Sequence, residues 1–411
     1  MNDLLRRVLK NSFILILYYC SLLFCFYLLL LYLGEGNKLS ANSFLNWDAG
    51  HYFKIAKNGY NDIYTSAFFP LFPFIWKFTG LNPIGISILN GLVYILSFSL
   101  LFGIYKWSTK FLLIAISTPS LIFMFLPYSE ATFFISSSIL LVGFYRNNKF
   151  LICLGLVLCG LARPVTTVFI PAILMTEFIS KKSNKEFLYN SFLFVFFSFV
   201  GLALSLLLQY LYTGSFTSFF EAQKEWGNSF QMPNFPLTSW AGGKIVKLDG
   251  SALLIGAVAG FSFLIILRNY IYNKINSTRK DILFSILYLS GICLLIFLVR
   301  GGSLFSLNRF VFATPFFLLG FYYFMQNVNF TYKSICISFF AILLFWLMCG
   351  SYVHIQTFLS FFILTCFLSL FLLLNSTNAI INKVVFFTIL ICNVSLQIYL
   401  FYRFISGEWV A

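Results

Sequence analysis

Residues 12–33 read SFILILYYCSLLFCFYLLLLYL, an uncharged stretch that follows Arg6, Arg7 and Lys10. A helix needs about 20 apolar residues to cross the hydrocarbon core of a bilayer, so this stretch predicts a membrane-spanning helix. Comparable runs recur along the whole chain. Together they predict an all-α, polytopic transmembrane bundle of about 11–13 spans, built as a single domain over residues 1–411.

The composition excludes most other classes of protein. Hydrophobic residues make up 60% of the chain and charged residues only 9%, whereas a soluble domain has about 25% charged residues. The formal charge of +15 comes from basic residues that lie singly or in short clusters between apolar runs, which is the pattern of a membrane protein. We therefore expect membrane lipids and no nucleic acid as partners. The nine Cys show neither a disulfide framework nor the spacing of zinc ligands.

The distribution of charge predicts the orientation. The predicted spans are 12–33, 84–104, 110–126, 130–145, 150–162, 165–180, 187–211, 251–268, 282–299, 310–325, 333–350, 353–374 and 383–402. With the N-terminus in the cytoplasm, sixteen of the 27 basic residues lie inside, and the net charge is +12 inside against +3 outside. Two long connections, 34–83 and 212–250, then lie on the outer face, where we expect the binding or catalytic site.

The first long connection contains the sequence Asn46-Trp47-Asp48-Ala49-Gly50-His51-Tyr52, which begins a helix-compatible run that Gly59 would end. Asp48, His51 and Lys54 are three residues apart, so on a helix they share one face. That face is either catalytic, or Asp48 interacts with the helix dipole while His51 and Lys54 are ordinary surface residues.

Several ionisable residues interrupt or border the apolar runs. An ionised group at mid-bilayer costs about 2.5–3.5 kcal/mol, so Glu130 and Arg163 need a partner or a water-filled cavity. They either form a structural salt bridge with each other, or Arg163 holds an anionic ligand through its planar guanidinium. Arg300 and Arg309 bracket a short outer loop and form a candidate phosphate clamp, although Arg300 could instead snorkel to lipid headgroups.

The second long connection contains Glu221-Ala222-Gln223-Lys224-Glu225-Trp226, which predicts a short amphipathic helix on the bundle. Gln223 and Trp226 are three residues apart and could contact a sugar ring by hydrogen bonding and stacking. An interfacial Trp anchor is the alternative.

These motifs together resemble the PIG-V-type mannosyltransferases, membrane glycosyltransferases of the GT-C superfamily, including their bacterial relatives. The resemblance runs from about residue 40 to the C-terminus and is strongest in the first long connection. The matching residues, in order, are Trp47-Asp48-Ala49-x-His51-Tyr52-x-x-Ile55-Ala56-x-x-Gly59-Tyr60, Phe68-Phe69-Pro70-Leu71-Phe72-Pro73, Tyr128-Ser129-Glu130, Ala162-Arg163-Pro164, Ala222-Gln223-x-x-Trp226, Arg309 ahead of Pro315, and Gly407-x-Trp409-Val410-Ala411.

The resemblance implies a GT-C-type bundle that transfers a mannose-like sugar from a polyprenyl-phosphate donor to a lipid or glycan acceptor. Asp48 is the expected general base, with His51 orienting it, and transfer by one base would invert C1. We expect Arg163, Arg309 and Arg300 at the donor phosphate, and the substrate-binding residues to be Trp47, Tyr52, Tyr60, Glu130, Gln223 and Trp226.

Two departures from the family pattern refine this expectation. The paired acidic motif of many GT-C enzymes is reduced to Asp48 followed by Ala-Gly-His, so we expect no cofactor and no bound metal, although a divalent metal remains an alternative. The chain is compact, which suggests a bacterial inner-membrane protein whose site faces the periplasm or exterior.

Two other functions fit parts of the sequence. A multispan transporter or lipid flippase would also carry scattered charges, but the two halves of the chain contain no corresponding pair of broken helices. A glycan polymerase or ligase that uses a lipid-linked glycan would share the chemistry and differ in its acceptor.

Overall fold

A computed structural model describes residues 2–181, 183–239, 246–273, 278–327, 331–350, 354–374 and 378–410. Within these ranges the chain is helical, and its extended segments form one isolated bridge, between Thr238 and Ser303, and no sheet. The predicted all-α fold is confirmed. Residues 240–245 of the second long connection and Ala411 of the C-terminal motif lie outside the described residues.

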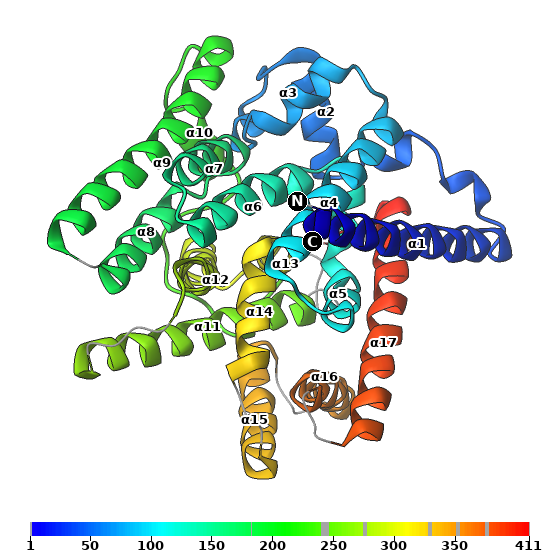
Figure 1. Cartoon of the computed structure of the whole chain (residues 1–411). Coiled ribbons are helices and arrows are strands. Elements are labelled where there is room, and N and C mark those ends of the chain that lie inside the picture. Colours follow the sequence, from blue (N-terminus) through cyan, green and yellow to red (C-terminus); the bar gives the residue numbers. More distant parts are fainter. Residues whose placement is uncertain are drawn as a thin grey trace.

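Seven helices of the described chain are long and apolar enough to cross a membrane, which makes the protein a multi-pass integral membrane protein. All seven correspond to predicted spans, and Figure 1 shows their arrangement in the bundle. They are α1 (Asn2–Tyr32), α4 (Pro83–Tyr105), α9 (Asn184–Thr213), α11 (Val246–Asn273), α12 (Lys280–Val299), α16 (Ile355–Leu373) and α17 (Ala379–Ile405).

The predicted span 110–126 is wrong. It divides into a short helix α5 (Thr109–Ile116) and a 3₁₀ segment η4 (Pro119–Phe125), because Pro119 has no N–H to continue the helical ladder. The next helix, α6 (Glu130–Arg146), follows η4 at an angle of 103°, and the pair counts as an eighth span only if it crosses as one broken element.

One other predicted span is also interrupted. The predicted span 310–325 is wrong as a continuous helix, because α13 (Leu307–Phe312) ends before Pro315, where α14 (Pro315–Asn327) begins. The remaining three are short helices: α7 (Lys149–Ala162), α8 (Thr166–Ser180) and α15 (Tyr332–Phe345), which is followed by η6 (Trp346–Met348).

Small residues let the short helices pack closely. A Cβ added to Gly155 of α7 would lie 2.6 Å from the Cα of Leu140 in α6. Gly160 of α7 meets Gly201 of α9 in the same way, at 3.0 Å. Such contacts let helix backbones pack closely in lipid, where the hydrophobic effect does not drive helices to associate. Close packing of α6, α7 and α9 fixes the positions of Glu130 and Arg163 at the ends of these helices.

The long connections form helices of their own. The first contains η1 (Gly36–Lys38), η2 (Asn42–Leu45), α2 (Asp48–Asn58), η3 (Ile63–Ala67) and α3 (Leu71–Thr79). As predicted, α2 ends at Gly59, whose φ of 74° suits glycine. The predicted short helix of the second connection is α10 (Ser218–Glu225). Figure 1 shows α2 and α3 together at the upper edge of the bundle, where Tyr52 packs against Phe72.

Candidate active site

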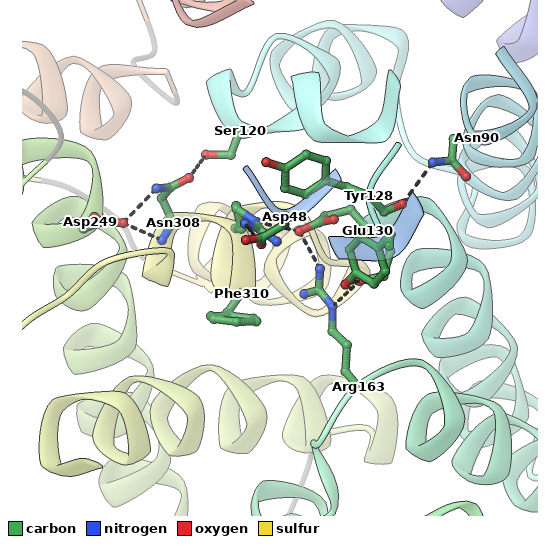
Figure 2. Close-up of polar contacts among 12 residues, drawn as sticks. Asp48, Asn90, Ser120, Tyr128, Glu130, Arg163, Asp249, Asn308 and Phe310 are labelled. Atoms are coloured by element: carbon green, nitrogen blue, oxygen red, sulfur yellow. Dashed lines mark hydrogen bonds and ion pairs between the residues drawn. The ribbon is translucent and has the colours of Figure 1, made fainter. Parts of the chain in front are cut away.

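Four ionisable residues from distant parts of the chain form one buried network (Figure 2). Arg309 donates from Nη1 to Oδ2 of Asp48 and from Nε to Oε1 of Glu130, both at 2.7 Å. Nη2 of Arg163 lies 2.6 Å from the same Glu130 oxygen. The salt bridge considered for Glu130 and Arg163 is therefore present, and it is part of a larger cluster.

Each member of the network lies where a helix starts or stops. Asp48 and Glu130 occupy the first turns of α2 and α6, where the helix dipole favours a negative charge. Arg163 is extended, with φ −154° and ψ 156°, between α7 and α8, because the following Pro164 disfavours a helical conformation. Arg309 lies in the short helix α13.

The members of the network differ in how far they are exposed. The side chains of Glu130, Arg163 and Arg309 are 0%, 4% and 4% exposed, whereas Asp48 is 16% exposed. Burial alone would lower the pKa of Arg309, but the charges of Glu130 and Asp48 raise it above its usual range. Arg309 therefore stays charged, and Asp48 is the accessible carboxylate.

Arg163 has donor capacity left over. Its Nη2 pairs with Glu130 without hydrogen-bond geometry, and its Nη1 has no hydrogen-bond partner within the described ranges. The guanidinium carbon lies 5.0 Å from the ring centroid of Phe133 and 5.1 Å from that of Phe310. A buried guanidinium with unused donors is suited to an anionic ligand.

A cavity of about 160 Å³ opens beside this network. This is below the roughly 300–1,000 Å³ usual for a whole ligand, so the cavity would hold only the head of a larger molecule. Of the predicted site residues, seven line it: Asp48, Tyr52, Arg163, Gln223, Trp226, Arg300 and Arg309. The lining thus contains three arginines and one carboxylate.

Arg300 is held within the protein. Its Nε donates to Oδ1 of Asn228 at 3.1 Å, its Nη1 donates to the carbonyl of Phe305, and its guanidinium carbon lies 3.6 Å from the Phe305 ring centroid. These contacts favour a place for Arg300 at the cavity over snorkelling to lipid headgroups. Burial lowers the pKa of Arg300 to about 10, which leaves it charged at neutral pH. Asn228 also donates to Oε1 of Gln223 at 2.7 Å, which links α10 to this corner of the cavity.

His51 lies beside the cavity, outside its lining. Its ring stacks on Phe68, with centroids 5.0 Å apart, and meets the edge of Trp226 at 5.6 Å. Burial lowers the pKa of His51, and the charge of Asp48 opposes this effect only in part. The Nδ1 atom is buried and has no hydrogen-bond partner within the described residues. Trp226 is oriented by donation from Nε1 to the Tyr64 carbonyl at 3.3 Å.

Two predicted tyrosines have different positions. Tyr52 lines the cavity and donates to Oγ of Ser129 at 2.8 Å. Tyr60 lies outside the lining and donates to the carbonyl of Phe68 at 2.9 Å, which orders the first connection.

Trp47, a predicted substrate-binding residue, lies outside the cavity lining and contacts the C-terminal segment. Trp47, with an unusual φ of 58°, meets Trp409 edge to face at 5.1 Å, and Trp409 lines the cavity. Next to it, Nδ2 of Asn46 donates to the carbonyl of Phe404 in α17 at 2.7 Å. A positive φ in a non-glycine residue is strained, and such strain is concentrated at functional sites. Trp47, which precedes Asp48, is therefore held in place by the C-terminal segment.

One buried acid next to the site was not predicted. Asp249, fully buried at the start of α11, accepts from the backbone N and Nδ2 of Asn308 at 2.9 and 2.7 Å and from Oγ of Ser239 at 2.7 Å. Asn308 accepts in turn from Oγ of Ser120 at 2.9 Å (Figure 2). These contacts fix the residue that precedes Arg309. The signal in the sequence was a lone acid bordering an apolar run.

Within the described ranges, no group of three or more His, Cys, Asp or Glu side chains lies together in the way a metal ion would need. No family model, curated protein or solved structure matches the chain. The chemistry proposed for the site therefore rests on its own geometry.

Proposed function

We propose that the protein is a membrane glycosyltransferase that moves a mannose-like sugar from a polyprenyl-phosphate donor to a lipid or glycan acceptor. The observation that carries the proposal is a partly accessible carboxylate, Asp48, in a cavity lined by Arg163, Arg300 and Arg309. A transfer from a lipid phosphate needs both features, a base for the acceptor and cations for the leaving phosphate.

The donor phosphate would bind on the arginine side of the cavity. Nη1 of Arg163 is buried and has no hydrogen-bond partner within the described residues, so it offers a donor to a phosphate oxygen. Arg300 and Arg309 add positive charge and are already fixed by Asn228, Asp48 and Glu130. Cations held in place before the reaction stabilise developing charge without reorganising.

In the reaction we propose, the Asp48 carboxylate accepts the proton of the acceptor hydroxyl while the hydroxyl oxygen attacks C1 of the sugar. The bond between C1 and the phosphate oxygen breaks, and its electron pair leaves with the lipid phosphate. A single displacement of this kind inverts C1. Gln223 and Trp226 line the cavity and would position the sugar by hydrogen bonding and stacking.

The small cavity supports a lipid-linked donor. About 160 Å³ admits the phosphate and part of the sugar, while the isoprenoid chain would remain in the surrounding bilayer. The charge asymmetry of the sequence supports a site on the extracytoplasmic face, the periplasmic or exterior side if the protein belongs to a bacterial inner membrane.

The test uses purified protein in detergent with polyprenyl-phosphate-[¹⁴C]mannose and a panel of membrane lipids. We expect a labelled glycolipid to form. In vesicles, movement of lipid without bond formation would instead identify a flippase. Extension of a supplied lipid-linked glycan would identify a polymerase or ligase. If the purified protein forms no labelled product with any acceptor, the proposal is wrong.

A further inference from the structure

A second, larger cavity of about 480 Å³ lies at the other end of the bundle. It is lined by the ends of α6 and α8, the last part of α11 and the start of α12. The candidate active site uses the opposite ends of the same helices, since Glu130 begins α6, Arg163 precedes α8 and Arg300 follows α12. The two cavities therefore lie near opposite faces of the membrane.

Three cations line the second cavity: Lys181, Arg279 and Lys280. Among the described residues that line it, Asp281 is the one acid. The buried Glu177 stands behind Lys280 and is the other acid in contact with the group. Three positive charges against two negative ones leave the site with an excess positive charge at neutral pH.

Arg279 is fixed in a defined orientation. Asp281 accepts from its Nε at 3.2 Å and from its Nη2 at 2.7 Å. Tyr105 donates its hydroxyl to the same carboxylate at 2.7 Å, and the guanidinium lies 4.7 Å from the Tyr145 ring centroid. The Nη1 side of the guanidinium is left for a ligand, and the side chain is 47% exposed. A guanidinium held in this way loses little entropy when it binds an anion.

The two lysines differ in how far they are neutralised. Nζ of Lys280 donates to both oxygens of Glu177 at 2.8 and 2.7 Å, and Asn190 donates to that carboxylate as well. Nζ of Lys181 donates to a neutral partner, Oδ1 of Asn184, at 3.0 Å. Lys181 therefore supplies the charge that the acids of this group do not balance.

We propose that this cavity binds a phosphate group at the membrane face opposite to the candidate active site. Arg279 would provide directional hydrogen bonds and Lys181 the uncompensated charge. Two tyrosines, Tyr145 and Tyr270, also line the cavity, as is common at the depth of lipid headgroups. The phosphate belongs either to an anionic phospholipid of that leaflet or to a soluble phosphate ester.

Two binding experiments on the full-length protein distinguish the sources. In the first, native mass spectrometry measures binding of phosphatidylglycerol, with diacylglycerol as the uncharged control. In the second, glycerol 1-phosphate is titrated against the detergent-solubilised protein. Binding of the lipid alone assigns the site to a headgroup, and binding of glycerol 1-phosphate assigns it to a soluble ester. If neither binds, the proposal is wrong.

Variants locate the binding. Arg279→Gln and Lys181→Gln should each weaken binding by roughly tenfold or more, as expected for a lost charge-assisted contact. Lys181→Gln leaves no buried acid unpaired, so it remains informative if Arg279→Gln fails to fold. Arg146→Gln is the matched control, because Arg146 is exposed at the same end of α6 and does not line the cavity. Equal binding by the three variants would overturn the proposal. Sugar transfer is not measured, so a failure of the proposed function leaves this test unaffected.

Discussion

Arg309 donates to Asp48 at 2.7 Å and so joins two residues that are 261 positions apart in the sequence. The same guanidinium also holds Glu130, which in turn pairs with Arg163. One arginine therefore fixes the orientation of the accessible carboxylate and connects it to the buried charges. Buried charges are tolerated when each has a partner. Removing one of them leaves its partners buried without a compensating charge.

Replacing Asp48 by Asn should reduce sugar transfer by roughly 10²–10⁴-fold, because the amide cannot accept the acceptor proton. Transfer of labelled mannose by the purified variant measures this. The matched control is Asp62→Asn, an exposed residue of the same connection that caps η3 and lies outside the cavity lining. Wild-type turnover by Asp48→Asn would remove Asp48 as the base.

Replacing Arg309 by Ala should destabilise the protein by about 3–5 kcal/mol, since Asp48 and Glu130 would then lose a buried partner. The midpoint of thermal unfolding in detergent measures the loss. The double variant Glu130→Gln/Arg309→Ala should recover part of it, because one unpaired charge is removed. No recovery would mean that Arg309 stabilises the fold mainly through packing.

Replacing Arg163 by Lys should raise KM for the donor with a smaller change in kcat, because lysine keeps the charge but loses the planar guanidinium. Initial rates over a range of donor concentrations separate the two constants. Lys224→Gln, an exposed residue of α10, should leave both constants unchanged. An unaltered donor KM in Arg163→Lys would contradict a phosphate contact at Arg163.

Replacing Asp249 by Ala removes the acceptor of two hydrogen bonds from Asn308, each worth roughly 1.5–3 kcal/mol when the acceptor is charged. We expect lower thermal stability and a higher donor KM, because α13 and Arg309 lose their anchor. Ser239→Ala removes one contact to the same carboxylate and should have a smaller effect on both quantities. Equal effects of the two variants would argue against an anchoring role for Asp249.

His51 should make stability depend on pH. Its pKa is lowered in the folded protein, chiefly by burial, whereas an unfolded histidine binds a proton below about pH 6.5. The unfolded state therefore binds more protons on acidification, and stability should fall as pH drops through this range. Unfolding midpoints between pH 7.5 and 5 should show a weaker slope for His51→Gln. The control is His354→Gln, the other histidine of the chain, which is exposed. A slope unchanged by His51→Gln would contradict the inference.

The helical membrane fold was predictable because long apolar runs leave few other structures possible in lipid. The boundaries of the short helices could not be predicted in the same way. Residues 110–126 are apolar except at Lys110 and at Ser117-Thr118-Pro119-Ser120, where the helix is interrupted, and the segment lies buried among other helices. Burial in protein and burial in lipid select the same residue types, so hydropathy alone does not separate them.

The members of the site were predictable singly, since charges such as Glu130 and Arg163 rarely occur in apolar runs without a function or a partner. The arrangement of these residues in the site could not be predicted, because their contacts depend on where the helices end in space. Asp249 could not be predicted, because it lies at the margin of an apolar run, where the sequence does not separate a connection from the first turn of a helix. The folded chain buries it completely.

The position of Trp409, which lines the cavity and contacts Trp47, affects how the protein is made. The ribosome synthesises α2 early and α17 late, and the segment after α17 supplies one wall of the cavity. During synthesis, the nascent polypeptide carries Asp48 for a long interval before that wall exists. We expect the cavity of such a polypeptide to stay incomplete until translation of the C-terminal segment is finished.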